Sequence, residues 1–156
     1  MKYFVTGVNG QLGHDVVNEL TGRGHTAVGS DISETYAGVA DGTAVTAAPY
    51  IQLDITDKHA VHEVIRSIQP DAVIHCAAWT AVDLAEDDDK VELVRRVNAD
   101  GTRHIALICR ELDCKMIYLS TDYVFDGQGE TPWHPDCKDY RPLNVYGQTK
   151  LEGELA

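Results

Sequence analysis

The sequence predicts an α/β fold, in which helices cover both faces of a mostly parallel, doubly wound sheet. Two observations indicate this fold. Short apolar runs alternate with longer segments of helical periodicity, and a glycine-rich turn joins the first run to the first helical segment. The five runs expected to be strands are Lys2–Thr6, Thr26–Ser30, Ile51–Leu53, Ala72–His75 and Met116–Leu119.

Helices are expected between these strands. The clearest is Lys58–Ile68, whose apolar side chains recur on one side and which Pro70 closes. Two stretches without a period, Ile32–Tyr50 and Gly127–Tyr140, are expected to be surface loops. The other expected helices are Gln11–Arg23, a long one from about Lys90 to Leu112, and a last one that begins near Leu143.

Composition and charge argue against several classes of protein. A hydrophobic content of 44% is ordinary for a globular protein. No apolar stretch approaches the roughly 20 residues that a membrane span needs, and the net charge of −12 argues against a nucleic-acid partner. The apolar run at Met1–Gly7 is too short for a secretory signal, so a cytoplasmic location is expected.

The cysteines and histidines show no metal-binding pattern, and no metal site is expected. The four cysteines form no CxxC pair and are expected to be reduced thiols. His59 and His62 lie three apart on a predicted helix and are expected at the surface, because further ligands are not evident. The acidic stretch 83–89 is expected to be a solvated helix start.

A glycine loop follows the first predicted strand directly. Its sequence is G-x-x-G-x-x-G over residues 7–13, and it opens the first predicted helix. Such a loop lets the backbone approach a pyrophosphate, whose charge the amide groups and the helix N-terminus then hold. The strand–loop–helix context therefore predicts a dinucleotide site in a Rossmann-type fold, with cofactor contacts at Gly7, Asn9, Gly10, Gln11, Leu12 and Gly13.

Asp31 is the candidate partner of the adenosine ribose. It ends the second predicted strand, about 20 residues beyond the glycine loop, where an acid can bind the ribose hydroxyls. No lysine or arginine occurs from Gly24 through Asp57, so nothing evident there would bind a 2′-phosphate. NADH or NADPH is expected as cofactor, and NADH is favoured. The alternative interpretation of Asp31 is a simple turn residue.

Tyr146 and Lys150 are the candidate catalytic pair. On a helix, positions i and i+4 share a face, so the phenol and the ammonium project to one side. The ammonium favours the phenolate, so that the tyrosine can donate or accept a proton at a substrate oxygen. Taken alone, this spacing is common in helices.

Two hydroxyl residues strengthen the pair because of their place in the predicted sheet. Ser120 and Thr121 end the fifth predicted strand. Ligands of open α/β sheets bind at the carboxyl ends of the strands, where the glycine loop and the helix of Tyr146 should also meet. The alternative is that both residues only terminate the strand.

The sequence resembles the extended short-chain dehydrogenase/reductases, and most of all the dTDP-4-dehydrorhamnose reductases. The resemblance covers essentially the whole chain. Its most specific parts are T-A-V-D-x-A-E at residues 80–86 and S-T-D-Y-V-F-D-G at residues 120–127. The other segments that carry it are Gly7–Gly13, Val97–Ala99 and Pro142–Glu154.

The resemblance implies roles for the candidate catalytic residues. Tyr146 would protonate the C4 carbonyl oxygen of a nucleotide-linked keto-sugar as hydride arrives from the nicotinamide. Lys150 would bind the nicotinamide ribose, and Thr121 would orient the carbonyl. Ser120 and Tyr123 would lie near the substrate. Asn98 matches an asparagine common in the family, with either a structural role or a role in proton transfer.

The resemblance also implies the remaining cofactor contacts. Asp54 and Ile55 match the adenine side of the family's site. Cys76, Ala77 and Ala78 match the small-residue stretch that lies against the cofactor, and Thr80 is a further expected cofactor contact. The implied activity is NAD(P)H-dependent reduction of dTDP-4-dehydro-6-deoxy-L-mannose to dTDP-L-rhamnose, in nucleotide-sugar and polysaccharide biosynthesis.

The implied organisation is one NAD(P)-binding Rossmann domain over residues 1–156, truncated inside the helix that carries Tyr146 and Lys150. A doubly wound sheet normally continues beyond a fifth strand, and residues 151–156 carry no C-cap signal. The expected missing part is the C-terminal substrate domain, which in the family holds the sugar pocket and usually the surface of a homodimer. The family's divalent cation has no complete site in this sequence.

Two alternatives stay open. One is a related epimerase or dehydratase acting on another nucleotide sugar, which would show no net consumption of NADH. The other is a non-catalytic subunit that binds dinucleotide and regulates a partner. The presence of Thr121, Tyr146 and Lys150 together argues against the regulatory subunit.

Overall fold

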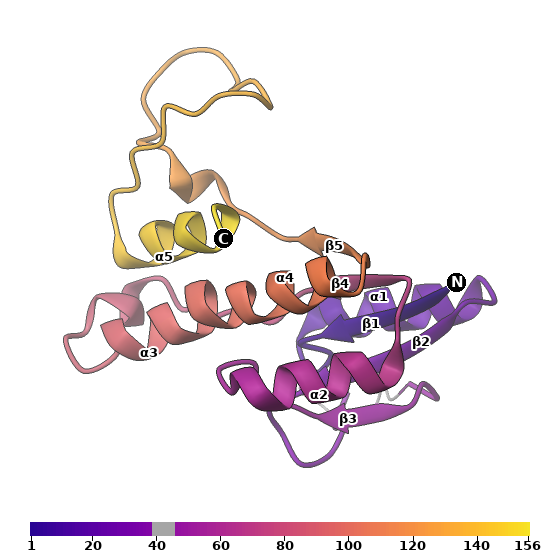
Figure 1. Ribbon diagram of the computed structural model, residues 1–156. Coiled ribbons are helices and arrows are strands. Elements are labelled where there is room, and N and C mark those ends of the chain that lie inside the picture. The colour runs from indigo at the N-terminus through magenta and orange to yellow at the C-terminus, as the bar shows by residue number, and fades with distance from the viewer. Residues whose placement is uncertain (39–45) are drawn as a thin grey trace.

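A computed structural model describes residues 1–38 and 46–156 (Figure 1). Five parallel strands form one sheet in the order β3-β2-β1-β4-β5. This order confirms the predicted α/β, Rossmann-type class, and the strand order reverses beside β1, where such sheets bind ligands. The strands are β1 (Lys2–Thr6), β2 (Thr26–Asp31), β3 (Tyr50–Gln52), β4 (Ala72–His75) and β5 (Lys115–Tyr118).

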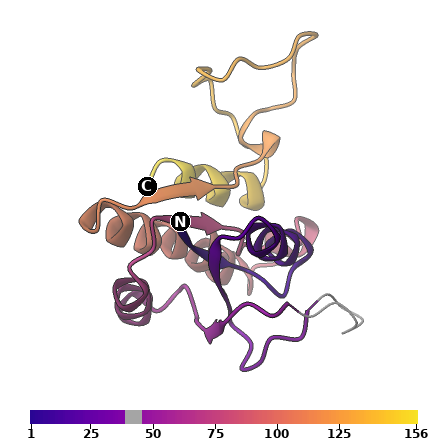
Figure 2. The same ribbon diagram turned by 90° about the vertical axis from the view of Figure 1, so that its right-hand side faces the viewer.

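The central strand β1 shows why the sheet is covered on both faces. Its successive residues Phe4 and Val5 are both fully buried, and they point to opposite faces. Phe4 belongs to the core cluster beneath α2 (Lys58–Ile68) and α4 (Thr102–Glu111), whereas Val5 packs with Val17 of α1 (Gln11–Gly22). Figure 2 shows α1 and α2 on opposite sides of the sheet.

The predicted long helix is present, but it is not a regular α-helix. It consists of α3 (Val91–Arg95), a π-helical segment η2 (Arg96–Gly101) and α4. At Gly101 an added Cβ would lie 2.8 Å from Ile55 Cδ1, so a residue without a side chain lets the segment approach the loop after β3. The π-helical segment is a departure from the predicted helix over 90–112, and such segments frequently occur at functional sites.

The acidic stretch is more than a solvated helix start. Its beginning forms a short 3₁₀ helix, η1 (Asp83–Glu86), in which Ala85 is buried. The carboxylate of Glu86 accepts a hydrogen bond from the Val145 amide at 2.6 Å, at the start of α5 (Val145–Glu154). The acidic side chains of this stretch are exposed, as expected, and Glu86 in addition bonds to the first turn of the helix of Tyr146.

The last part of the chain leaves one end of the sheet uncovered. Strand β5 pairs only with β4 among the described strands, and the side chain of Ile117 is 51% exposed. A short 3₁₀ helix, η3 (Asp122–Val124), follows, and residues 125–141 form a loop that extends away from the rest of the protein (Figure 1). Across residues 1–38 and 46–156, every helix is too short or too polar to span a membrane.

Candidate functional site

A cleft of about 460 Å³ lies at the carboxyl ends of β1, β2 and β4. Its volume is in the range of pockets that hold small ligands. The wall combines residues from seven separate parts of the chain, which the sheet order brings together. The predicted site residues that line it are Gly7, Gly10, Gln11, Leu12, Gly13, Asp31, Asp54, Ile55, Ala77, Ala78, Thr80, Ser120, Tyr146 and Lys150.

The glycine loop approaches the strand end beside it closely. Gly7 has a φ of 73°, in the left-handed region, and a Cβ at this position would lie 2.6 Å from the Ala77 amide nitrogen. The turn closes with a 3.1 Å hydrogen bond from the Gly10 amide to the Gly7 carbonyl. Only glycine satisfies both requirements at position 7, which explains the first glycine of the motif.

The N-terminus of α1 faces the cleft without a side-chain cap. Gly10 is the N-cap residue, and no side chain bonds to the first amides of the helix. Gln11, Leu12 and Gly13, which carry these amides, line the cleft. Unpaired amide groups and the positive end of the helix dipole together form an anion site, and a pyrophosphate is the group that suits it.

Asp31 lines the cleft at the end of β2 and also organises the loop beside it. One carboxylate oxygen accepts the Asn9 amide at 3.0 Å, and the other accepts the Ile32 amide at 2.8 Å. Both oxygens keep further lone pairs for a ligand. Among the described residues that line the cleft, Lys150 is the only lysine or arginine, and it comes from α5.

Asn9 does not line the cleft, although it lies within the glycine motif. Its side-chain oxygen accepts the Ala37 amide at 3.0 Å, while its buried side-chain nitrogen has no hydrogen-bond partner among the described residues. Asn9 therefore ties the glycine loop to the segment after β2. That segment is fixed further by Tyr36, which hydrogen-bonds to the buried His14 of α1 and stacks on it. The remainder of the predicted loop, residues 39–45, lies outside the described residues.

Lys150 is held inside the protein beside the cleft. Its side chain is almost fully buried, and Nζ donates a 2.6 Å hydrogen bond to the Leu119 carbonyl. The ammonium also lies 4.2 Å from the centre of the Tyr118 ring, an attractive cation–π arrangement. Burial lowers the pKa of Lys150 to about 8, because the charged form is poorly solvated there.

The helix of Tyr146 is positioned by tight backbone contacts. Asn144 caps it by accepting the Gly147 amide at 2.7 Å, and Gly147 itself packs directly against the Tyr123 carbonyl. The rings of Tyr146 and Tyr123 meet edge to face with centroids 5.5 Å apart. These contacts place the phenol of Tyr146 on the cleft wall that also holds Lys150.

Three predicted substrate residues have different surroundings. Ser120 lines the cleft, but its hydroxyl donates to the Glu154 carboxylate at 2.6 Å. Thr121 and Tyr123 do not line the cleft. Thr121 caps η3, accepting the Tyr123 amide at 3.2 Å, and faces a second, more open hollow beside Trp133 and Tyr140.

Several residues that line the cleft were missed by the sequence reasoning. Most of them are direct neighbours of predicted residues at strand ends, so the rule that ligands bind at the carboxyl ends of strands could have found them. Val97 comes from the π-helical segment; it lies in a stretch that carries the family resemblance, but no role at the site was expected for it. The missed residues are Thr6, Ser30, Ile32, Leu53, Val97 and Leu119, whereas the resemblance had already placed Cys76 against the cofactor.

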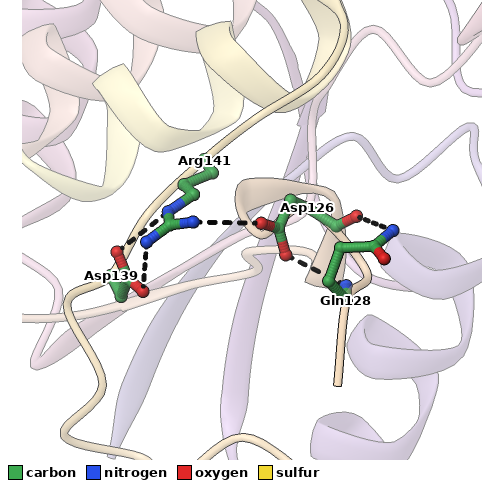
Figure 3. A network of polar contacts seen from close by, with 4 residues as sticks. All are labelled: Asp126, Gln128, Asp139 and Arg141. Atoms are coloured by element: carbon green, nitrogen blue, oxygen red, sulfur yellow. Dashed lines mark hydrogen bonds and ion pairs between the residues drawn. The ribbon is translucent and has the colours of Figure 1, made fainter.

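The loop of residues 125–141 is closed at its base by Arg141 (Figure 3). The guanidinium forms two hydrogen bonds with the Asp139 carboxylate, at 2.9 and 3.1 Å, and a longer ion pair of 3.6 Å with Asp126. Asp126 in turn accepts the Gln128 amide at 3.0 Å. These contacts join the two ends of the loop next to the hollow that Thr121 faces.

The cysteines and the histidine pair do not gather into a metal site in the described parts of the chain. No group of three or more histidine, cysteine or acidic residues there is placed to hold a metal ion. His59 is exposed and pairs with Glu63 at 3.6 Å, whereas His62 is partly buried, so the expectation of two surface histidines holds only for His59. The four cysteines are free thiols.

The parallel sheet, the glycine loop and the uncapped helix N-terminus define a Rossmann-type, NAD(P)-binding class of protein, of the extended short-chain dehydrogenase/reductase kind. The profile of the family described as the RmlD substrate binding domain matches residues 1–156, and the chain belongs to this family. Similar proteins support this placement. A dTDP-4-dehydrorhamnose reductase from Streptomyces griseus is 39% identical over 155 residues, which are 99% of this chain and 44% of the relative.

Two solved structures extend the comparison. A dTDP-4-dehydrorhamnose reductase from Bacillus anthracis, in complex with NADP, has a TM-score of 0.78 and 32% identity over 99% of this chain and 48% of its own. A UDP-glucose 4-epimerase from Brucella ovis, in complex with NAD, has a TM-score of 0.83 and 27% identity over 99% of this chain and 46% of its own. The chain thus spans about half the length of the relatives that it matches.

Proposed function

We propose that this chain supplies the NAD(P)H-binding part of a dTDP-4-dehydrorhamnose reductase. The complete reaction would convert dTDP-4-dehydro-6-deoxy-L-mannose to dTDP-L-rhamnose, for nucleotide-sugar and polysaccharide biosynthesis. The observation that carries the proposal is the meeting of the glycine loop, Tyr146 and Lys150 in one cleft. The 39% identity to the Streptomyces griseus reductase supports the choice of substrate.

The residues at the cleft fit a dinucleotide. The uncapped start of α1 would hold the pyrophosphate, and Asp31 would accept hydrogen bonds from the adenosine ribose. Asp54 and Ile55 would flank the adenine, while the small side chains of Ala77 and Ala78 would permit close approach of the cofactor. Thr80 would lie further along the same wall.

The reduced dinucleotide would supply a hydride to C4 of the sugar. Tyr146 would donate its proton to the C4 oxygen, which becomes the hydroxyl of the product, and would regain a proton from solvent. Lys150 would hydrogen-bond the nicotinamide ribose and, as an ammonium, stabilise the phenolate that Tyr146 leaves. Thr121 would orient the carbonyl, with Ser120 and Tyr123 nearby.

The role of Thr121 requires a change from the contacts that it makes here. Its hydroxyl donates to Asp122 at 3.2 Å, and the residue faces the neighbouring hollow. The Ser120 hydroxyl is likewise engaged by Glu154. We propose that substrate draws the Thr121 hydroxyl toward the Tyr146 side.

NADH is proposed as the preferred cofactor. Asp31 would repel a 2′-phosphate, and the described residues of the cleft place no cation beside it. The Bacillus anthracis relative was solved with NADP, so the preference is a property to be measured for this chain rather than one that the family fixes. Asp31→Asn removes the repelling charge while it keeps the size, and should narrow the difference in affinity between NADH and NADPH.

Activity is tested in the complete reductase to which this chain is proposed to belong, by following loss of the reduced nicotinamide with the keto-sugar present and by identifying the product as dTDP-L-rhamnose. Tyr146→Phe should abolish turnover but leave dinucleotide affinity within about twofold, because the phenol acts on the substrate oxygen. Tyr3→Phe, at a partly buried position on β1 that does not line the cleft, is the matched control. Equal turnover by parent and Tyr146→Phe would contradict the proposed role.

A second candidate is a nucleotide-sugar epimerase, which the likeness to the Brucella ovis epimerase supports. An epimerase returns the hydride to its product, so a UDP-sugar would be interconverted without net loss of NADH. Product formation without consumption of reduced nicotinamide would favour this candidate over the reductase.

A homodimer is proposed for either enzyme. Light scattering, which measures the mass of the particle in solution, tests this proposal.

A further inference from the structure

The wall of the cleft after β4 is a short segment of irregular backbone, residues 76–80, called here the post-β4 segment. Side chains from the interior hold it at two points. The Ala77 amide donates to Thr6 Oγ1 at 3.2 Å, and the Trp79 amide donates to Asn98 Oδ1 at 2.8 Å. Asn98 also donates back to the Trp79 carbonyl at 3.2 Å. Thr6 and Asn98 are thus the two anchors of this wall.

His75 joins the two anchors inside the protein. It is 2% exposed, and its Nδ1 lies 2.7 Å from Thr6 Oγ1. Its Nε2 lies 3.1 Å from Thr102 Oγ1, and Thr102 donates at 2.6 Å to the Asn98 carbonyl. The Thr6–His75 contact follows from the sheet, because these two residues are paired in the parallel register of β1 and β4.

The protons of this chain of bonds can be assigned one by one. Burial lowers the pKa of His75 to about 3, so the imidazole is neutral at physiological pH and carries a single ring proton. Thr102 uses its only proton on the Asn98 carbonyl and can therefore only accept from His75. The ring proton is then on Nε2, and Nδ1 accepts the proton of Thr6. Each donor in this chain therefore has one acceptor. The hydrogen bonds run in one direction, from Thr6 to His75, from His75 to Thr102 and from Thr102 to the Asn98 carbonyl.

Asn98 extends the same network to the helix of the catalytic pair. Its side-chain nitrogen donates to Thr149 Oγ1 at 3.2 Å, and Thr149 donates to the Tyr146 carbonyl at 3.0 Å. Gly153 packs against the Asn98 carbonyl so closely that an added Cβ would lie 2.5 Å from its oxygen. The π-helical segment therefore contacts both the cleft wall and α5.

We propose that His75 is a positioning residue, which through Thr6 and Thr102 fixes the post-β4 segment and sets it relative to the helix of Tyr146 and Lys150. It does not line the cleft: its ring contacts Thr6 of β1 and Thr102 of α4, and stacks on Tyr118 of β5. Its role would be to keep the Ala77–Trp79 backbone in the conformation that admits the dinucleotide. This proposal deepens the proposed function and rests on it for the identity of the ligand.

Thr102 offers the sharpest test, because it belongs to the network but not to the cleft wall. Thr102→Val keeps the shape and removes the hydroxyl, leaving the His75 ring proton and the Asn98 carbonyl without their partner. We expect the dissociation constant for the better-bound dinucleotide to rise about tenfold, and amide hydrogen exchange at Ala77 and Trp79 to become faster. Thr102→Ser restores the hydroxyl and should restore both quantities to within about twofold.

Ile105→Val is the matched control. Ile105 is fully buried on the same helix, and its truncation should lower the free energy of unfolding by about 1 kcal/mol without touching the network. This variant should leave dinucleotide affinity and exchange at Ala77 and Trp79 unchanged. If Thr102→Val only matches Ile105→Val, with a lower unfolding temperature and unchanged affinity and exchange, the proposal is overturned.

Nitrogen NMR of the parent protein tests the proton assignment without any variant. We expect the Nε2–H tautomer of His75, with a slowly exchanging ring proton. The Nδ1–H tautomer would overturn the proposed order of bonds even if Thr102→Val failed to fold. Failure of the parent to bind either dinucleotide would instead count against the proposed function, while the exchange and tautomer measurements would still decide the role of His75.

Discussion

Two segments follow neighbouring strands of the sheet and are held in opposite ways. The post-β4 segment is fixed from the interior by Thr6 and Asn98, through hydrogen bonds that are partly buried. The loop of residues 125–141, which comes after β5, extends away from the rest of the protein. It is held mainly by contacts within itself, and Tyr140 donates one hydrogen bond of 3.0 Å to Glu154 of α5. Phe125 stacks between Trp133 and Tyr140, and Arg141 closes the base.

The comparison separates a segment whose conformation is fixed by the rest of the fold from a segment whose conformation is fixed mainly by its own contacts. Buried hydrogen bonds with every partner satisfied strongly favour one conformation, because an unpaired group in the interior costs free energy. Exposed ion pairs contribute little and are screened by salt. We therefore expect the post-β4 segment to be preformed for its ligand, and the 125–141 loop to adjust when substrate binds.

The largest effect on dinucleotide binding is expected from Gly7→Ala, whose added Cβ would press the glycine loop against the post-β4 segment. The added Cβ would lie 2.6 Å from the Ala77 amide, at a φ of 73° that alanine rarely adopts. We expect dinucleotide binding to be lost and the free energy of unfolding to fall by about 2 kcal/mol or more. Titration and chemical denaturation measure the two quantities.

The control for this variant is Gly127→Ala. Gly127 also has a positive φ, of 69°, but no atom lies within 4 Å of the added Cβ. It should therefore show only the cost of the backbone conformation and keep dinucleotide binding. Equal losses of binding in both variants would show that the close approach at Ala77 is not what matters.

Low pH should destabilise the protein at the post-β4 segment, because it protonates His75. The folded-state pKa of about 3 is below the usual value of 6.5, so the unfolded chain takes up the proton first as the pH falls. Stability is fully present above pH 6.5 and is lost toward pH 3, by on the order of 4 kcal/mol. The difference in unfolding free energy between parent and His75→Gln should shrink over this window, and a constant difference would contradict the assignment.

A smaller effect is expected from breaking the aromatic stack of the 125–141 loop. Phe125 and Trp133 lie parallel with ring centroids 4.5 Å apart. Phe125→Ala should cost about 1 to 2 kcal/mol at most, since the loop is largely exposed, and should make the loop more sensitive to protease. Dinucleotide affinity should stay unchanged; a marked loss would mean that the loop and the cleft are coupled in the free protein.

The smallest effect is expected from Arg141→Ala, which removes the closure at the base of the loop. An exposed ion pair contributes about 1 kcal/mol or less, so the unfolding free energy should hardly move. Raising the salt concentration should reduce the difference between parent and variant further. A loss of several kcal/mol would show that the loop is held as firmly as the post-β4 segment.

The sequence predicted most of the fold because the signals for it are local. The glycine loop, the apolar periodicity of Lys58–Ile68 and the five strand runs all depend on neighbouring residues, and the strands were found within about two residues of their ends. The cleft followed from the same elements, since parallel strands end on one side.

The parts that the sequence did not predict depend on contacts between distant residues. The Thr6–His75 bond requires the register of β1 against β4, which no local pattern encodes. The π-helical segment depends on how Gly101 meets Ile55, and the position of Asn9 off the cleft depends on a bond to Ala37. The glycine motif alone could not show that Asn9 bonds to the segment after β2 while its neighbours line the cleft.

The central claim is that this chain forms a dinucleotide site, and the most direct test is isothermal titration with NADH and NADPH in parallel. We expect binding of one molecule per chain, tighter for NADH, with a difference that narrows in Asp31→Asn. Tighter binding of NADPH would contradict the role given to Asp31. No binding of either dinucleotide by the folded chain would contradict the claim itself.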